Sequence, residues 1–518
     1  MAGLRRRRGA THDPEERDAD LHHRPARRHP GQRSERLTPL PLLRELVASP
    51  PRGCEYAEAR WVQRTSEQLR VSGGRVDGIE CASEEGVGIR VAVPGHGFGF
   101  AATREVTKTG LELALARAVS IARALPDSPR RGPLPPVLPA RGHWASVCDI
   151  DPFALSLGDR LELLLRAESL LRGDPRIVRG VAESLAIRTA AAFASSDGAA
   201  FTQERTECGG GISAYAAADG ELQQRSYPSG HGGSVALAGY EHLIALDLPG
   251  HAPRVAEEAL ALLRAPPCPA GRTTLVLGDE QLALQIHESI GHALELDRIL
   301  LGEASYAGAS WVSPSDVGTL RYGSPLLSIS ADATLPGGLG SFGWDDEGVA
   351  AQRTMLIEDG VLRATLSDRQ SAAVVGARSG GAARADGFAR QPIVRMTNVS
   401  LEPRDGGTLE QLIAEVPSGV YMETNRSWSI DDRRLHFQFG TEIGREIRDG
   451  RLGRLLRNPT YAGVTPQFWG SLEAVASAPA WRLWGLLNCG KGEPGQTAHV
   501  SHGTSPARFR DVEVGVLR

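Results

Sequence analysis

The chain has 518 residues, a formal net charge of −4, 60 glycines and 33 prolines. This length allows two or three domains with substantial cores, and the charge gives no reason to expect a nucleic acid as partner. No apolar run is long enough to span a bilayer, and no apolar segment follows the N-terminal arginines as it would in a secretory signal. Six cysteines without paired spacing suit a reducing compartment. We therefore expect a cytoplasmic protein with no membrane partner.

Residues 1–36 differ from the rest of the chain. They contain ten arginines against six acidic residues, and almost no large apolar side chain follows Leu4. Such a composition cannot build a core, so we expect a disordered basic tail. Arg5–Arg8 could contact nucleic acid or a membrane surface, but we favour a solvated tail or an over-extended gene start.

Folded structure is expected from about residue 38 onward. Helical spacing of apolar residues predicts helices at 40–47, 109–125, 160–172 and about 254–264. Strands are predicted through 55–103, with turns at 72–75 and 94–96, and again after 172, with turns at 196–198 and 219–220. Residues 130–136 are predicted to form a linker, and Pro266–Pro269 to mark the start of a strand-rich C-terminal half.

The predicted fold class is α+β. An N-terminal mixed sheet-and-helix region is expected to precede a strand-rich C-terminal catalytic domain that carries a metal-binding helix. The predicted boundaries are 1–36 for the tail, 37–140 for an N-terminal α+β domain, 141–268 for a middle strand-rich region and 269–518 for the C-terminal domain.

The most informative motif runs from His287 through Glu288 to His292, after the apolar run 273–277 and within a predicted helix. Neutral imidazoles bind Zn²⁺, and an adjacent Glu can take a proton from a metal-bound water. The spacing H-E-x-x-x-H is one residue longer than the familiar metalloprotease motif. Residues five apart on an α-helix are rotated by about 140°, so the rings would not converge. We therefore predict a π-bulge or a helix break, with Gly291 a plausible place for it; two ordinary histidines are the alternative.

A third protein ligand has several candidates further along the chain. They are Cys489, His436, His499, His502, Glu295 and Asp297. Cys489 stands in a segment expected to be a glycine-rich loop, two residues before Lys491, which is one of only two lysines in the chain. Glu295 and Asp297 could instead orient a ligand imidazole, and each remaining histidine could also be an ordinary one.

With these motifs the chain resembles the TldD/PmbA family over residues 38 to 518, and its TldD branch in particular, which carries H-E-x-x-x-H; the PmbA (TldE) branch lacks it. The resemblance rests on the zinc motif together with segments 84–91, 97–103, 287–297, 356–362, 395–403 and 488–491. It implies that His287, His292 and Cys489 bind zinc and that Glu288 is the catalytic base. Glu493 and Pro494 interrupt the family's usual Cys-Gly-Lys-Gly-Gln pattern, which puts the shape of that loop in question.

The resemblance implies a zinc-dependent peptidase that hydrolyses short or unfolded peptides, with a metal-bound water as nucleophile. It also implies a dimer, with a PmbA-like chain or with a second copy. Two other functions stay open from the sequence. One is a non-catalytic scaffold subunit of such a complex, and the other is a cysteine hydrolase that pairs Cys489 with His499 or His502.

Overall fold

The computed structural model describes residues 38–95, 97–125, 134–302 and 308–516, so the predicted tail and part of the predicted linker lie outside the described residues. Mixed helices and strands confirm the predicted α+β class. Within the described part of the chain, no helix combines the length and the apolar character needed to cross a membrane.

The N-terminal sheet contains strands from both of the predicted regions before residue 268. Its strand order is β3-β2-β1-β5-β6-β4, and β7 and β8 also pair with β6. The predicted turn at 72–75 is present, because Gly73 and Gly74 both adopt positive φ between β1 and β2. The strands are β1 (Tyr56–Ser72), β2 (Arg75–Ala92), β3 (Phe98–Thr103), β4 (Arg141–Ala145), β5 (Ile177–Ser195), β6 (Ala200–Ala218), β7 (Glu221–Tyr227) and β8 (Ser234–Ala236).

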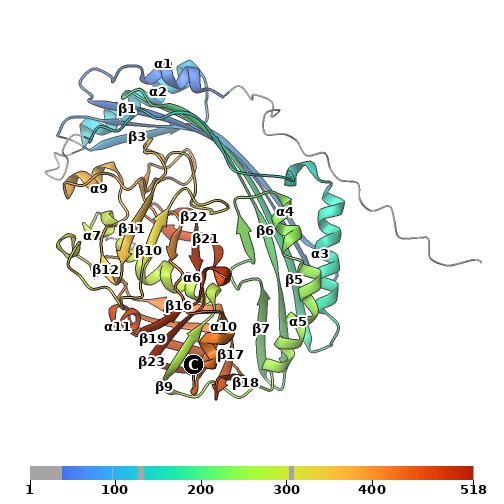
Figure 1. Ribbon diagram of the computed structural model, residues 1–518. Helices are drawn as coiled ribbons and strands as arrows, with labels where there is room; N and C mark the ends of the chain where they lie inside the picture. The colour runs from blue at the N-terminus through green and yellow to red at the C-terminus, as the bar shows by residue number, and fades with distance from the viewer. Residues whose placement is uncertain (1–37, 96, 126–133, 303–307, 517–518) are drawn as a thin grey trace, which may run out of the picture. The chain divides into compact units, whose positions relative to one another are not determined.

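Helices pack on this sheet at its two ends, α1 and α2 at one and α3 to α5 at the other (Figure 1). They are α1 (Leu40–Val47), α2 (Lys108–Ala124), α3 (Leu157–Leu171), α4 (Tyr240–Ala245) and α5 (Leu248–Leu262). The first three helices predicted from the sequence are confirmed. The fourth begins earlier than predicted, because the Asp247 side chain accepts a hydrogen bond from the Gly250 N–H and caps the helix at that point.

The C-terminal half is dominated by strands, as predicted. A seven-stranded sheet has the order β16-β9-β23-β19-β17-β18 with β20 beside β23, a four-stranded sheet has the order β12-β11-β10-β15, and β13–β14 and β21–β22 form two-stranded pairs. The strands are β9 (Gly271–Leu277), β10 (Ile329–Asp332), β11 (Arg353–Glu358), β12 (Val361–Leu362), β13 (Ala383–Arg384), β14 (Ile393–Val394), β15 (Val399–Leu401), β16 (Ser418–Ile430), β17 (His436–Arg448), β18 (Arg451–Leu456), β19 (Pro459–Val464), β20 (Leu472–Val475), β21 (Arg482–Lys491), β22 (Gln496–Thr504) and β23 (Ala507–Val516). The short helices are α7 (Leu296–Ile299), α9 (Arg369–Val374), α10 (Leu409–Ala414) and α11 (Thr465–Gly470).

Helix α6 (Asp279–Ile286) lies inside the C-terminal half and leads into the motif that carries His287. It follows β9 after Gly278, and all of its residues from Glu280 to Ile286 are buried. The helix packs against β16 and against the β21–β22 hairpin. A helix buried on all sides has no solvated face, so the polar groups that it carries must find partners inside the protein.

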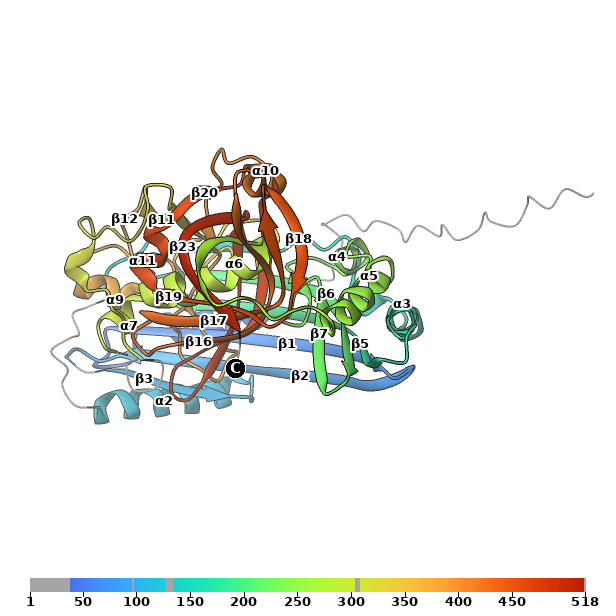
Figure 2. The same ribbon diagram turned by 90° about the horizontal axis from the view of Figure 1, so that it is seen from below.

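The long strands of the N-terminal sheet run along one side of the C-terminal elements (Figures 1 and 2). Buried ion pairs join the two halves. Arg225 of β7 donates to Glu423 at 2.6 Å and lies 3.4 Å from Glu442, and Arg90 of β2 donates to Glu347 at 2.8 Å. Losing one partner of such a buried pair costs about 3–5 kcal/mol, so these contacts fix how the halves meet.

Candidate metal centre

Three of the predicted ligands converge in the structure. The ligand atoms of His287, His292 and Cys489 all lie within 4.8 Å of one another, and all three side chains are buried. The two imidazole rings have centroids 4.7 Å apart and stand nearly perpendicular, at 84°. Residues 197 positions apart in sequence therefore meet at one point, with His292 Nε2 3.6 Å from Cys489 Sγ.

The two histidines converge because the helix widens between them, as the five-residue spacing predicts. Residues His287–Gly291 form a π-helical turn in which the His292 N–H donates to the His287 carbonyl, five residues back. A Cβ on Gly291 would lie 2.0 Å from the Met396 sulfur, so any other residue at this position would require the buried Met396 side chain to move. The Ser289 carbonyl in the turn accepts a hydrogen bond from the Tyr322 hydroxyl at 2.6 Å.

The orientation of His287 is set by a chain of neutral groups. His502 Nδ1 lies 2.7 Å from the Val399 carbonyl, which can only accept, so Nδ1 carries the hydrogen and Nε2 is left as an acceptor. His287 Nδ1 lies 2.8 Å from that Nε2 and must donate to it. His287 Nε2 therefore presents its lone pair to the centre. Burial lowers the pKa of His287 to about 4 and that of His502 well below its ordinary value, which keeps both rings neutral.

The orientation of His292 is set by charged groups instead. His292 Nδ1 lies 3.0 Å from Glu295, which leaves Nε2 free to face Cys489. Lys491 Nζ lies 3.4 Å from Glu295 and donates to both oxygens of Asp297, at 2.7 and 2.9 Å. Burial alone would raise the pKa of Glu295, but Lys491 and His292 hold it well below its ordinary value. Glu295 and Lys491 thus support the ligands indirectly, as carboxylates behind a metal-binding histidine commonly do.

Cys489 comes from a strand and not from the predicted glycine-rich loop. It lies in β21, next to a β-bulge between Leu486 and Cys489, and pairs with Ala498 of β22. The loop prediction was wrong because the glycines around Cys489 are accommodated within the hairpin. Pairing continues to Lys491 and Gln496, so Glu493 and Pro494 fall in the turn beyond the cysteine.

The surroundings of Cys489 favour its thiolate. Burial alone would raise the pKa of the thiol, but Arg395 and His292 lower it below its ordinary value. Arg395 also donates a hydrogen bond to the Cys489 carbonyl. A thiolate beside two neutral imidazoles is a donor set that Zn²⁺ accepts.

Glu288 is buried beside the ligands, and its Oε2 accepts a hydrogen bond from Arg434 Nη1 at 2.7 Å. Arg434 was missed by sequence reasoning, because nothing in its local pattern sets it apart from the chain's many other arginines. Arg395 was missed as a functional residue, although it opens one of the segments that carry the family resemblance. Both are separated from the histidines by more than 90 residues of sequence.

The other candidate ligands are engaged elsewhere. His436 pairs with Asp431 at an exposed site, and His499 Nδ1 lies 2.5 Å from Glu207. His502 contacts His287, as described above. The ring that approaches the Cys489 sulfur is that of His292, so the pairing with His499 or His502 required for a cysteine hydrolase is not found among the described residues.

The geometry fits a zinc ion. Zn–N distances of about 2.0–2.1 Å and a Zn–S distance of about 2.3 Å place tetrahedral nitrogen and sulfur ligands about 3.6 Å apart. His292 Nε2 and Cys489 Sγ have this separation. With these three side chains as its protein ligands, a zinc ion would keep a fourth position for water or substrate, as catalytic zinc sites do.

Comparison with known proteins gives the family to which this chain belongs. The chain matches PmbA/TldA metallopeptidase domain 1 at residues 57–122, the central domain at 150–265 and the C-terminal domain at 270–516. The protein belongs to the TldD/PmbA family of metallopeptidases.

Individual relatives agree with this assignment. The chain is 29% identical to a metalloprotease of Methanothermobacter thermautotrophicus, over 89% of this chain and 95% of that protein. It is 26% identical to a zinc metalloprotease TldD homolog of Saccharolobus solfataricus, over 48% of this chain and 52% of that protein. The crystal structure of TldE from Thermococcus kodakarensis shares the fold, with a TM-score of 0.69, 16% identity and coverage of 92% of this chain and 99% of that one.

Proposed function

We propose that the protein is a zinc-dependent peptidase in which His287, His292 and Cys489 hold the metal and Glu288 is the general base. The observation that carries this proposal is the convergence of three buried ligand atoms beside a carboxylate, with both imidazoles oriented by hydrogen bonds. The six scattered cysteines support a place in the cytoplasm.

A zinc ion bound by these residues would lower the pKa of water and stabilise negative charge on a carbonyl oxygen. The side chains of the protein transfer the proton and hold the reacting groups in position. Arg434 holds Glu288 through Oε2, which leaves Oε1 to take a proton from the attacking water and to give it to the leaving amine. His502 and Glu295 keep the two ligand imidazoles in the required tautomers.

The proposed substrates are short or unfolded peptides. An extended backbone can pair with a strand edge near the site without much selection among side chains. Membership of the family supports peptides as the substrate class. The geometry of the centre supports a hydrolytic reaction without identifying the substrate.

Metal analysis of the wild type and Cys489→Ala, with peptide turnover in the same preparations, tests the proposal. We expect about one zinc per wild-type chain, and loss of both zinc and turnover in Cys489→Ala. Cys268→Ala is a matched control, because Cys268 is also buried and burial raises its thiol pKa to about 12. Wild-type protein that hydrolyses peptides without bound metal would refute the zinc proposal, whereas protein that neither holds zinc nor hydrolyses peptides would favour the scaffold function.

We also propose that the protein works as a dimer, with a PmbA-like chain or with a second copy. A peptidase of low selectivity would damage other proteins unless its site were secluded, and a partner subunit is a simple way to narrow access to it. Light scattering, combined with assays on a short peptide and on a folded protein, tests this. An active monomer that cleaves both substrates equally would overturn it.

A further inference from the structure

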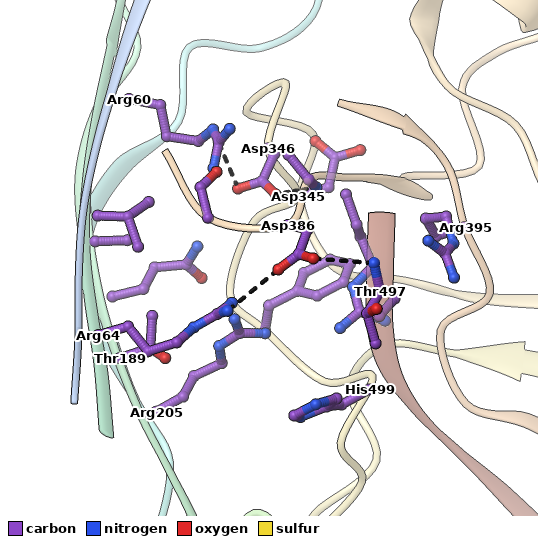
Figure 3. A pocket seen from close by; sticks show the side chains of 18 of the residues that line it. Arg60, Arg64, Thr189, Arg205, Asp345, Asp346, Asp386, Arg395, Thr497 and His499 are labelled. Carbon is purple, nitrogen blue, oxygen red and sulfur yellow. Dashed lines mark hydrogen bonds and ion pairs between the residues drawn. The ribbon is translucent and has the colours of Figure 1, made fainter. Parts of the chain in front are cut away.

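A second polar site lies between the N-terminal sheet and the C-terminal half. It is a cavity of about 240 Å³, and its wall does not include the three metal ligands. Arg60, Arg64 and Arg205 reach into it from β1 and β6, facing Asp346 and Asp386 (Figure 3). The cavity is strongly charged, so the balance of its charges decides what it can bind.

Most of the carboxylates in the wall are already engaged. Asp386 pairs with Arg64 at 3.1 Å and accepts the Thr497 N–H at 3.0 Å, while Asp346 lies 3.8 Å from Arg60. Glu207 is bound to His499, as noted above. Asp345 accepts hydrogen bonds from backbone N–H groups, at 3.0 Å from Glu347 and 2.8 Å from Val349.

Three guanidinium groups in the wall form no ion pair with a carboxylate of the described residues, namely those of Arg205, Arg384 and Arg395. Arg395 donates to the carbonyls of Gln496 and Cys489. The guanidinium group of Arg205 has no hydrogen-bond or ion-pair partner among the described residues, although the residue is half-buried. Arg384 is buried, and within the described part of the chain its guanidinium group donates to two backbone carbonyls, those of Met396 and Leu339, at 2.9 and 3.5 Å. Burial, followed by repulsion from Arg205 and Arg395, lowers the pKa of Arg384 to about 9. A buried cation without a counter-charge is costly, so this wall favours an anion.

We propose that this cavity is a binding site for a small doubly charged oxyanion, such as a phosphate ester or a dicarboxylate, held by Arg205 and Arg384. The planar guanidinium group offers a fork of N–H donors that matches the paired oxygens of carboxylate and phosphate. Two such groups beside one cavity suit a ligand with two negative charges. Arg205 comes from the N-terminal sheet and Arg384 from β13, so the ligand bridges the two halves of the protein.

Calorimetric titration of the metal-loaded full chain tests the site, with sodium phosphate and sodium succinate as probes at constant ionic strength. We expect saturable binding of at least one anion, and the tighter of the two identifies the ligand chemistry. Arg205→Gln should weaken that binding by about tenfold or more, since it removes charge-assisted hydrogen bonds. Arg205→Lys should bind with intermediate affinity, because it keeps the charge but loses the fork.

Arg75→Gln is the matched control, since it removes the same charge from an exposed position at the far end of the sheet, in β2. It should bind the anion as the wild type does. Thermal unfolding gives a second readout, because an anion that binds the folded state raises the midpoint in the wild type and in Arg75→Gln more than in Arg205→Gln. Absence of saturable binding by either anion overturns the proposal. Equal affinity in the wild type and Arg205→Gln also overturns it, because the anion would then occupy another place, including the metal centre.

Discussion

The β21–β22 hairpin contributes residues to two polar clusters that present opposite charge to a ligand. Successive side chains of a strand alternate between its faces, so Thr497 and His499 line the cavity while His502 reaches the metal centre. The metal centre presents two lone pairs and a thiolate, which suit a cation. The cavity presents the guanidinium groups of Arg205 and Arg384, which suit an anion.

The two clusters also differ in how far each group is compensated. At the metal centre, each ligand side chain is supported by a neighbour of matching polarity, and Lys491 balances the nearby carboxylates. At the cavity, the guanidinium groups of Arg205 and Arg384 form no ion pair with any carboxylate of the described residues, although several acidic side chains share the wall. The contrast shows that the positive and negative side chains of a polar cluster need not all be paired with one another. Unpaired charges can instead serve to bind a ligand that enters the cluster. Variants that disturb one cluster at a time test it.

Lys491→Met is expected to have the largest effect. Lys491 is fully buried and compensates Glu295 and Asp297, so its loss leaves buried negative charge without a partner. We expect the free energy of unfolding to fall by about 3–5 kcal/mol, as measured by urea denaturation. Lys108→Met is the control, because the only other lysine forms an exposed pair with Glu45 and should change little. Equal effects of the two substitutions would mean that Lys491 does not compensate these acids.

Glu288→Gln separates proton transfer from metal binding. All three ligands remain, so zinc content should be unchanged, while peptide turnover should fall by about a hundredfold or more through loss of a positioned base. Zinc analysis and turnover on one preparation measure both. Near-normal turnover in zinc-loaded protein would exclude Glu288 as the base, and loss of zinc would make it a ligand.

His502→Phe breaks the neutral chain behind His287 and leaves the charged chain behind His292 intact. We expect zinc affinity to fall by about 10–100-fold, as measured by competition with a chelator. His502→Gln should restore part of that affinity, because its amide can accept from His287 and donate to the Val399 carbonyl. If both variants bind zinc as the wild type does, His502 is only a packing residue.

The sequence predicted the metal centre far better than the cavity, and the reason is physical. His287, Glu288 and His292 are close in sequence, and their spacing alone predicts a π-bulge or a helix break, of which the structure has the former. Cys489 came from the family resemblance, and its strand was mistaken for a loop because pairing across a hairpin is not visible in a run of glycines. The cavity is assembled from β1, β6, β13 and β22, which no local pattern connects.

Helices and turns were also predictable, because they depend on neighbours in sequence. The helices at 40–47 and 109–125 were placed within one residue of their ends. The start of α5 was missed, since the cap at Asp247 lies outside the apolar repeat. The domain boundaries remain predictions. Strands before and after residue 141 form a single sheet, and the contacts between them cannot be predicted from apolar periodicity.

A pH-dependent effect is expected at the start of α6, on the metal side of the hairpin. Glu280 is buried and accepts the Asn425 N–H at 2.9 Å. Burial raises the pKa of Glu280 to about 8, from 4.5. Between these two values the folded chain holds a proton that the unfolded chain has released, so stability falls as the pH rises.

Glu280→Gln keeps a neutral side chain at every pH and removes this loss. The stability of the variant relative to the wild type should therefore increase from pH 5 to 8, by up to about 1.4 kcal/mol per pH unit. Urea denaturation of both proteins across this range measures the difference, in which the titration of all other groups cancels. A difference that does not change with pH would show that Glu280 is already ionised in the folded protein. Its charge would then need a partner as effective as the one that Lys491 provides for Glu295 and Asp297.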